Sequence, residues 1–330
     1  LYETKAPAYY NPDVIAHFDT MKVEQVGEDR VYVSDCRGSS PPSTHKVCVN
    51  TLGAYKQSIE VLLTGLDIEK KAEIYVDQIF HNLGGKEQFT DVDIHLIRSD
   101  KEDPASNEEA HAALRITITS DDPSKLGRLL QAKVTELGLA AIPGNTGRGA
   151  AGYNGNPVIA YWPTLIDSRK VTERVHINGD LIEVLPTQRL GLEERYYQEV
   201  PVKIPPAPSG DTTRIPFGRL FGTRSGDKGG AANCGVWAKT DEAFGFLHEF
   251  LTVEKFKELA PDMASYKIER FDLPNLRALN FYIHDVLGEG VSSNHRIDKQ
   301  AKSLCEYLRA KTIEAPTLLV DQIARTNLNE

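Results

Sequence analysis

The densest group of chemically active side chains lies between Thr223 and Asn233, in the segment TRSGDKGGAAN. Two cations, Arg224 and Lys228, are combined there with a carboxylate, an amide and three glycines. Glycine lets backbone N–H groups turn toward a bound group at close range. Because the segment separates two predicted strands, near 215–222 and 234–239, we expect a loop in which Arg224 and Lys228 hold a phosphate or carboxylate.

Within this loop, Asp227 is expected to orient Lys228, and Asn233 to add an amide donor. Lys228 could also act as a base if burial lowered its pKa. Asp227 and Lys228 are therefore the predicted catalytic residues. The predicted substrate-binding residues are Arg224, Ser225, Gly229, Asn233, Asn280, His295 and Arg296. The alternative is an ordinary glycine-rich hairpin loop with an Asp–Lys pair on its surface.

Two further segments of the chain are rich in glycine and could take part in binding. Residues 287–293 could place His295 or Arg296 against the first glycine loop, or could form a turn that leads to a helix cap at Asp298. Residues 147–152 match G-x-G-x-x-G, but they follow a helix and precede a strand, whereas a dinucleotide site needs strand, turn and helix in that order. Residues 143–155 are predicted to be a connecting loop, with a lid as the alternative.

A weaker candidate is a divalent-metal site at Asp91, Asp93 and His95. The two-residue period of a strand puts these side chains on one face, and carboxylates with an imidazole can bind a divalent cation. The alternative is the solvated face of an amphipathic strand whose apolar residues lie inside. We favour the solvated face and predict no cofactor.

Composition limits the class of protein. The chain has 330 residues, 40% of them hydrophobic, and a net charge of −9, which argues against nucleic-acid binding and leaves small anionic substrates open. The four cysteines form no C-x-x-C pair, so reduced thiols in the cytoplasm are expected. No apolar run is long enough to span a bilayer. The start at Leu1, without Met, suggests a fragment or a processed chain.

The pattern of elements predicts an α+β protein with two sandwich domains. Residues 58–63, 92–97, 114–118 and 158–162 read as strands. Helices are predicted after Asp67 and from Asp122-Pro123, which gives the order β-α-β-β-α-β of ferredoxin-like domains. A hairpin is predicted near 21–34.

The proline-rich segment 201–212 is the predicted linker between domains 1–200 and 213–330. In the second domain, Thr252 and Asp298 are predicted helix caps, and residues 267–273 and 277–283 are predicted strands.

The C-terminal part resembles the acyclic terpene utilisation (AtuA-like) family. The resemblance rests on RSGDKG at 224–229, LPNLRALNF at 273–281, LGEGV at 287–291 and Asp298 with Ala301-Lys302. The N-terminal part resembles the second half of the family's main domain through LYE at 1–3, PDV at 12–14, QVG at 25–27 and WPTL at 162–165. The family's first half would then precede Leu1. The resemblance implies a ferredoxin-like C-terminal domain and a setting in acyclic terpene breakdown through acyl-CoA esters.

Two functions are expected from these observations. The first is an enzyme of branched acyl-CoA metabolism that uses acid–base chemistry on an acyl-CoA or carboxylate. The second is a non-catalytic scaffold of a terpene-degradation complex. The expected partners are a small anionic substrate and a second copy of the chain, with no nucleic acid and no membrane.

Overall fold

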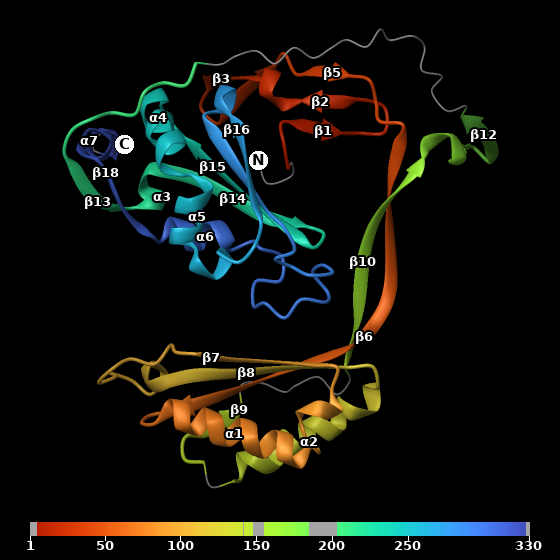
Figure 1. Cartoon of the computed structure of the whole chain (residues 1–330), viewed down its shortest axis with the longest axis vertical. Helices are drawn as coiled ribbons and strands as arrows, with labels where there is room; N and C mark the ends of the chain where they lie inside the picture. The colour runs from red at the N-terminus through yellow and green to blue at the C-terminus, as the bar shows by residue number, and fades with distance from the viewer. Residues whose placement is uncertain (1–4, 141, 148–154, 185–202, 328–330) are drawn as a thin grey trace. The chain divides into compact units, whose positions relative to one another are not determined.

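A computed structural model describes residues 5–140, 142–147, 155–184 and 203–327 (Figure 1). The fold is α+β, as the sequence predicts. It divides into two compact units, residues 50–160 and residues 1–49 with 161–330. The predicted boundary at 201–212 does not separate these units. Within the larger unit, the carbonyl groups of Pro205 and Pro206 lie next to Gly245, and the Ala207 N–H is 3.5 Å from Glu249 Oε1.

The smaller unit has the predicted β-α-β-β-α-β order. Its strands align as β10-β6-β8-β7, with β9 also paired to β6, and α1 and α2 cover one sheet face (Figure 1). Its elements are β6 (Thr44–Thr64), α1 (Ile68–Asn82), β7 (Asp91–Ile97), β8 (His111–Ser120), α2 (Arg128–Gly138), β9 (Asn145–Gly147) and β10 (Asn156–Asp167). The ferredoxin-like prediction is confirmed here.

One helix of this unit begins later than predicted. The Asp122 carboxylate accepts a hydrogen bond from the Ser124 N–H, but it caps a single 3-10 turn. Gly127, with φ +66°, then breaks the chain direction, and α2 begins at Arg128. By contrast, α1 begins directly after Asp67 as predicted, and it buries Ala72, Ile79 and other residues against the sheet. Asp67 occupies the N-cap position, but its side chain makes no capping hydrogen bond.

The larger unit contains a four-stranded antiparallel sheet of order β14-β15-β17-β16 and a separate pair, β13 with β18. Its C-terminal elements are β13 (Thr212–Pro216), α3 (Phe217–Leu220), β14 (Phe221–Lys228), β15 (Ala231–Ala238), α4 (Asp241–Phe250), α5 (Val253–Leu259), β16 (Ile268–Leu273), β17 (Ala278–Ile283), α6 (Leu304–Arg309), β18 (Thr312–Pro316) and α7 (Thr317–Asn327). The first predicted strand is thus divided by α3.

The helices of this unit cover one face of the four-stranded sheet. Phe221, Val236 and Phe281 point into a core shared with Phe244 of α4 and Leu308 of α6. We call this the helix face, and the opposite face the helix-free face. The alternation of side chains along each strand assigns every strand residue to one of these faces.

Two helix caps were predicted in this unit. Thr252 caps α5 as predicted, since its hydroxyl accepts a hydrogen bond from the Lys255 N–H. Asp298 does not cap a helix, contrary to prediction. Its carboxylate accepts hydrogen bonds from the N–H groups of Lys302 and Ser303, which form a turn. Helix α6 begins after this turn, at Leu304.

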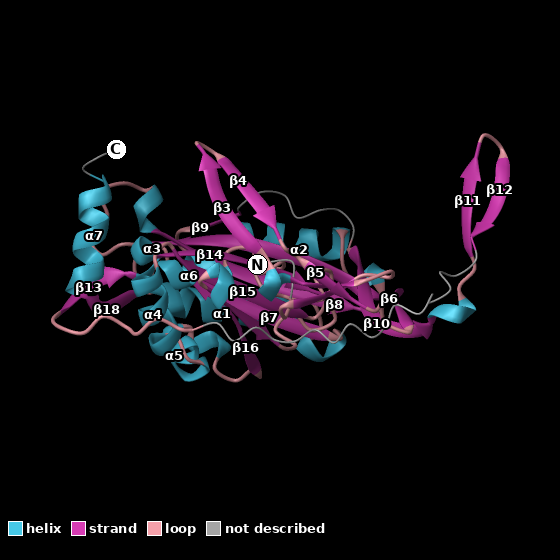
Figure 2. Ribbon diagram, turned by 90° about the horizontal axis from the view of Figure 1, so that it is seen from above, coloured by secondary structure: helices cyan, strands magenta, loops and turns pink. Residues whose placement is uncertain are grey.

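The remaining strands are short. β1 (Ala8–Tyr10), β2 (Ile15–His17) and β5 (Arg37–Ser39) form one sheet. β3 (Lys22–Gly27) and β4 (Arg30–Ser34) form the predicted hairpin, and β11 (Glu173–Ile177) and β12 (Asp180–Val184) form a second hairpin (Figure 2). Both hairpins expose branched side chains, including Val31 and Ile182.

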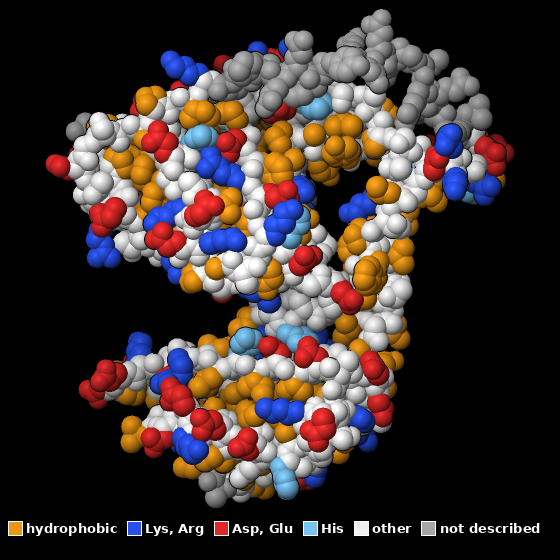
Figure 3. Space-filling model, in the orientation of Figure 1, with side chains coloured by type: hydrophobic (Ala, Val, Ile, Leu, Met, Phe, Trp, Pro, Cys, Tyr) orange, Lys and Arg blue, Asp and Glu red, His pale blue; other side chains and the backbone are white. Residues whose placement is uncertain are grey.

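Positive and negative side chains are interspersed over the face shown in Figure 3, without a broad basic patch in that view. No described helix is long and apolar enough to cross a membrane.

Candidate functional site

Most of the predicted glycine loop is strand. β14 continues through Arg224 to Lys228, and β15 begins at Ala231, so the connection is the two-residue turn Gly229-Gly230. Gly229 has φ +66°, which a two-residue hairpin turn requires and which glycine adopts without strain. The sequence prediction of a loop was wrong because the glycines and charges obscure the alternation of the strand.

The strand places the predicted residues on two different faces. Arg224 and Lys228 share the helix-free face, whereas Ser225 and Asp227 point to the helix face. Asp227 and Lys228 thus lie on opposite faces of the sheet, and the predicted orienting role of Asp227 stays a prediction. The Asp227 carboxylate lies 4.0 Å from Lys302 Nζ.

Ser225 has a structural partner on the helix face. Its hydroxyl accepts a hydrogen bond of 3.0 Å from the backbone N–H of Cys305 at the start of α6. Ser225 is 4% exposed, so it is buried between the sheet and the helix. The predicted role of Ser225 in substrate binding stays a prediction.

Asn233 and Asn280 lie at the centre of the helix-free face. Both side chains are 0% exposed, and Asn233 Nδ2 donates to Asn280 Oδ1 at 3.1 Å. Asn280 Nδ2 in turn donates to the backbone carbonyl of Lys5 at 2.9 Å. The structure thus brings together two of the predicted substrate-binding residues and connects them to the N-terminal segment.

Tyr282 extends this polar group along β17. It is paired with Asn233 in the β15–β17 register, and the Lys5 ammonium lies 4.6 Å from its ring centroid. Burial raises the pKa of Tyr282, and the charges of Lys5 and Lys46 oppose this effect. Lys5 also pairs with Glu269 at 3.1 Å, and hydrogen bonds from His284 and Lys5 lower the pKa of Glu269.

A phenol, a thiol and an ammonium group meet beside the hairpin turn. Tyr161 Oη lies 3.3 Å from Cys48 Sγ, and Lys46 Nζ lies 5.8 Å from the Tyr161 ring centroid. A hydrogen bond with Tyr161 raises the pKa of Lys46, which favours the ammonium form. Sequence analysis missed this group because Lys46 and Tyr161 are far apart in the chain and meet through the pairing of β6 with β10. The one local signal was the two-residue spacing of Lys46 and Cys48, which places both side chains on the same face of a strand.

The turn Gly229-Gly230 is packed too tightly for side chains. A Cβ at Gly229 would lie 2.8 Å from the Tyr161 ring, and one at Gly230 would lie 2.0 Å from the carbonyl oxygen of Gly288. The Leu287 N–H donates to the Gly230 carbonyl at 2.8 Å. The second glycine-rich segment, residues 287–293, therefore contacts the first through Leu287 and Gly288.

His295 and Arg296 follow this contact in the chain. The Arg296 guanidinium binds Asp262 at 3.0 Å, which is an ion pair outside the glycine turns. His295 is half-buried in the segment before Asp298. Their predicted part in substrate binding stays a prediction.

The weaker metal candidate lies in the other unit. His95 Nε2 is 3.1 Å from Asp93 Oδ1, and the Asp91 carboxylate accepts a hydrogen bond from the Val92 N–H. Among the described residues, no group of three or more His, Cys, Asp or Glu side chains is arranged to hold a metal ion. The lid alternative falls mostly on residues 148–154, which lie outside the described residues.

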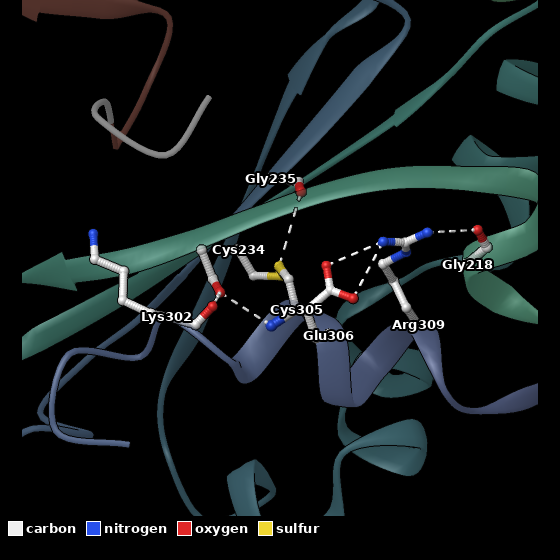
Figure 4. A network of polar contacts seen from close by, with 8 residues as sticks. Gly218, Cys234, Gly235, Lys302, Cys305, Glu306 and Arg309 are labelled. Carbon is white, nitrogen blue, oxygen red and sulfur yellow. Dashed lines mark hydrogen bonds and ion pairs between the residues drawn. A yellow bond between two sulfur atoms is a disulfide. The ribbon is translucent and has the colours of Figure 1, made fainter.

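The expectation of four reduced thiols was wrong for two cysteines. Cys234 on β15 and Cys305 on α6 form a disulfide, because both point into the core between sheet and helix (Figure 4). Cys234 is 0% exposed and Cys305 is 1% exposed. Cys36 and Cys48 are exposed thiols.

Comparison with known proteins gives two matches along the chain. The model of the family described as "Acyclic terpene utilisation family protein AtuA" matches residues 1–177, and that of the "AtuA ferredoxin-like domain" matches residues 215–314. No curated protein matches the chain. No solved structure matches it either.

Proposed function

Because the chain belongs to the AtuA family, which has a role in acyclic terpene utilisation, we propose that it is an enzyme acting by acid–base chemistry on an acyl-CoA or carboxylate. Arg224 and Lys228 would hold the anionic groups on the helix-free face. The observation that supports the proposal is the gathering on this face of two cations, a fully buried Asn233–Asn280 pair and two lysines beside tyrosines.

The spacing of the two cations favours acyl-CoA over a simple carboxylate. Arg224 and Lys228 are four residues apart in an extended strand, so their Cα atoms are about 13 Å apart. A ligand with negative groups distributed along its length could contact both side chains, whereas a single carboxylate could contact one at a time. CoA carries separated phosphates and therefore has this form.

Proton transfer would come from the phenol groups. Tyr282 is held neutral by burial, which suits a hydrogen-bond donor to a developing oxyanion. Tyr161 lies beside the Lys46 ammonium and the Cys48 thiol, so its hydroxyl could donate or accept a hydrogen bond there. Asp227, which lies on the helix face, would serve the site through Lys302 rather than through Lys228.

Lys228→Ala tests the proposal. A thermal-shift screen against CoA, acyl-CoA esters and free branched acids should give a shift in the parent protein that is lost in Lys228→Ala. Lys239→Ala, a cation just beyond β15, is the matched control and should keep the shift. An unchanged shift in Lys228→Ala, with the fold intact, contradicts the proposal.

A second candidate function is a scaffold for a terpene-degradation complex. The hairpins β3–β4 and β11–β12 favour it, because two-stranded hairpins with exposed Val31 and Ile182 are marginally stable in water without a partner. The same surfaces would suit a homo-oligomer. Co-purification with a stable partner, together with no response to any small molecule in the screen, would support the scaffold over the enzyme.

A cytoplasmic location completes the proposal. The exposed thiols of Cys36 and Cys48 suit a reducing compartment. The Cys234–Cys305 disulfide argues in the other direction, since disulfides are rare in the cytosol. Its burial would shield it from reductants. Fractionation followed by thiol labelling tests the location.

A further inference from the structure

The unit of residues 50–160 contains a cavity that the proposed reaction does not use. Its volume is about 520 Å³, within the range of small-molecule sites, and residues of β6, α2 and β9 form part of its lining. Apolar side chains form much of its lining, namely Ile59, Val61, Tyr75, Val134 and Leu139. Such a lining suits an aliphatic group.

A buried amide oxygen lies in the same cavity. Gln131 of α2 lines it, and its Oε1 is buried and has no hydrogen-bond partner among the described residues. Leaving a buried acceptor unsatisfied costs about 1 to 3 kcal/mol, so a donor from a ligand would be stabilising there. A ligand that places an O–H or N–H group next to Gln131 Oε1 would therefore satisfy this acceptor.

The lining of the cavity contains one negatively and one positively charged side chain. Glu60 and Arg115 both line it, and they face each other in the β6–β8 register. Burial raises the pKa of Tyr75 to about 12, so its hydroxyl stays neutral at physiological pH. A ligand carboxylate would meet Glu60 and the Gln131 oxygen, whereas a ligand ammonium would meet Arg115. A neutral ligand avoids both costs.

We propose that this cavity binds a neutral medium-chain aliphatic alcohol, whose hydroxyl donates to Gln131 Oε1 and whose chain lies against Val61 and Val134. A hydroxyl can donate to this acceptor without bringing a charge into the cavity. The site is separate from the proposed anion site on the helix-free face, and the two proposals do not depend on each other.

Calorimetric titration of the whole chain with a matched series tests this proposal. The probes are 1-octanol, octanoate and octylamine, which share one chain and differ in charge. We expect 1-octanol to bind at least tenfold more tightly than either charged probe. Gln131→Leu keeps the approximate shape of the side chain and removes the acceptor, so it should weaken 1-octanol binding by about two- to twelve-fold.

Two further variants distinguish binding in this cavity from nonspecific binding elsewhere on the protein. Val134→Phe should fill the cavity and abolish binding, and Gln78→Leu, an exposed change on α1, should leave binding unchanged. If Val134→Phe does not fold, Gln131→Leu and the probe series still decide. Equal or tighter binding of octanoate, no binding of 1-octanol, or unchanged 1-octanol binding in Gln131→Leu overturns the proposal.

Discussion

The buried disulfide makes a large and measurable contribution to the stability of the larger unit. Cys234 and Cys305 are 71 residues apart in sequence, and closing a loop of that length in the unfolded chain is worth about 4 kcal/mol. We expect Cys305→Ala, or reduction of the parent protein, to destabilise this unit by that amount. With a urea m-value of about 2 to 3 kcal/mol/M, the midpoint should fall by about 1.3 to 2 M.

Tryptophan fluorescence is the suitable probe for this experiment. The chain has two tryptophans, Trp162 and Trp237, and both belong to the larger unit, so the signal reports its unfolding. Cys48→Ala, an exposed thiol, is the control and should leave the midpoint unchanged. A count of four reactive thiols in the denatured, unreduced protein would refute the reasoning. So would a urea midpoint that reductant does not change.

Three further changes test the packing and charges of the candidate site. Gly230→Ala should destabilise by about 1 to 3 kcal/mol, because its Cβ would overlap a facing backbone carbonyl. Gly138→Ala in α2 has open space around it and should be neutral or slightly stabilising, so equal effects in urea unfolding would contradict this. Asn280→Ala leaves the buried Asn233 amide without its acceptor and should cost about 1 to 3 kcal/mol in the same assay; a smaller loss would count against the pair. Glu269 has a lowered pKa in the folded state, so its stabilisation is present above the unfolded pKa near 4.5 and is lost as pH falls through the folded value. Glu269→Gln should therefore reduce the dependence of stability on pH below about 4.5, and an unaltered acid limb would argue against the ion pairs.

The alternation of apolar residues was sufficient to predict the order of elements in the smaller unit, although not the bounds of that unit. Strands at 92–97 and 114–118 and the helix after Asp67 have clear periodicity, so the β-α-β-β-α-β order followed from the sequence. The start of α2 was predicted too early because the Asp122 cap and the following proline are also the signature of a helix. The positive φ of Gly127, which cannot be read from the sequence, moves the helix start to Arg128.

The candidate site could be predicted only where its residues are local in sequence. The glycine and charge density of 224–233 identified the right hairpin, although not its extended form. The contact of Lys46 and Cys48 with Tyr161 depends on the pairing of distant strands, as does the Cys234–Cys305 disulfide. Such pairing is set by the tertiary fold, so no local pattern reveals it.

The most direct test of the proposed anion site is the affinity for an acyl-CoA. Dissociation constants for octanoyl-CoA should be measured by calorimetry for the parent protein, Arg224→Ala, Lys228→Ala and the control Lys239→Ala. A hydrogen bond to a charged group is worth about 1.5 to 3 kcal/mol, so each site variant should bind about 10- to 150-fold more weakly. Lys239→Ala should match the parent. Equal affinities in all four proteins, or no binding by the parent, would contradict the proposed site.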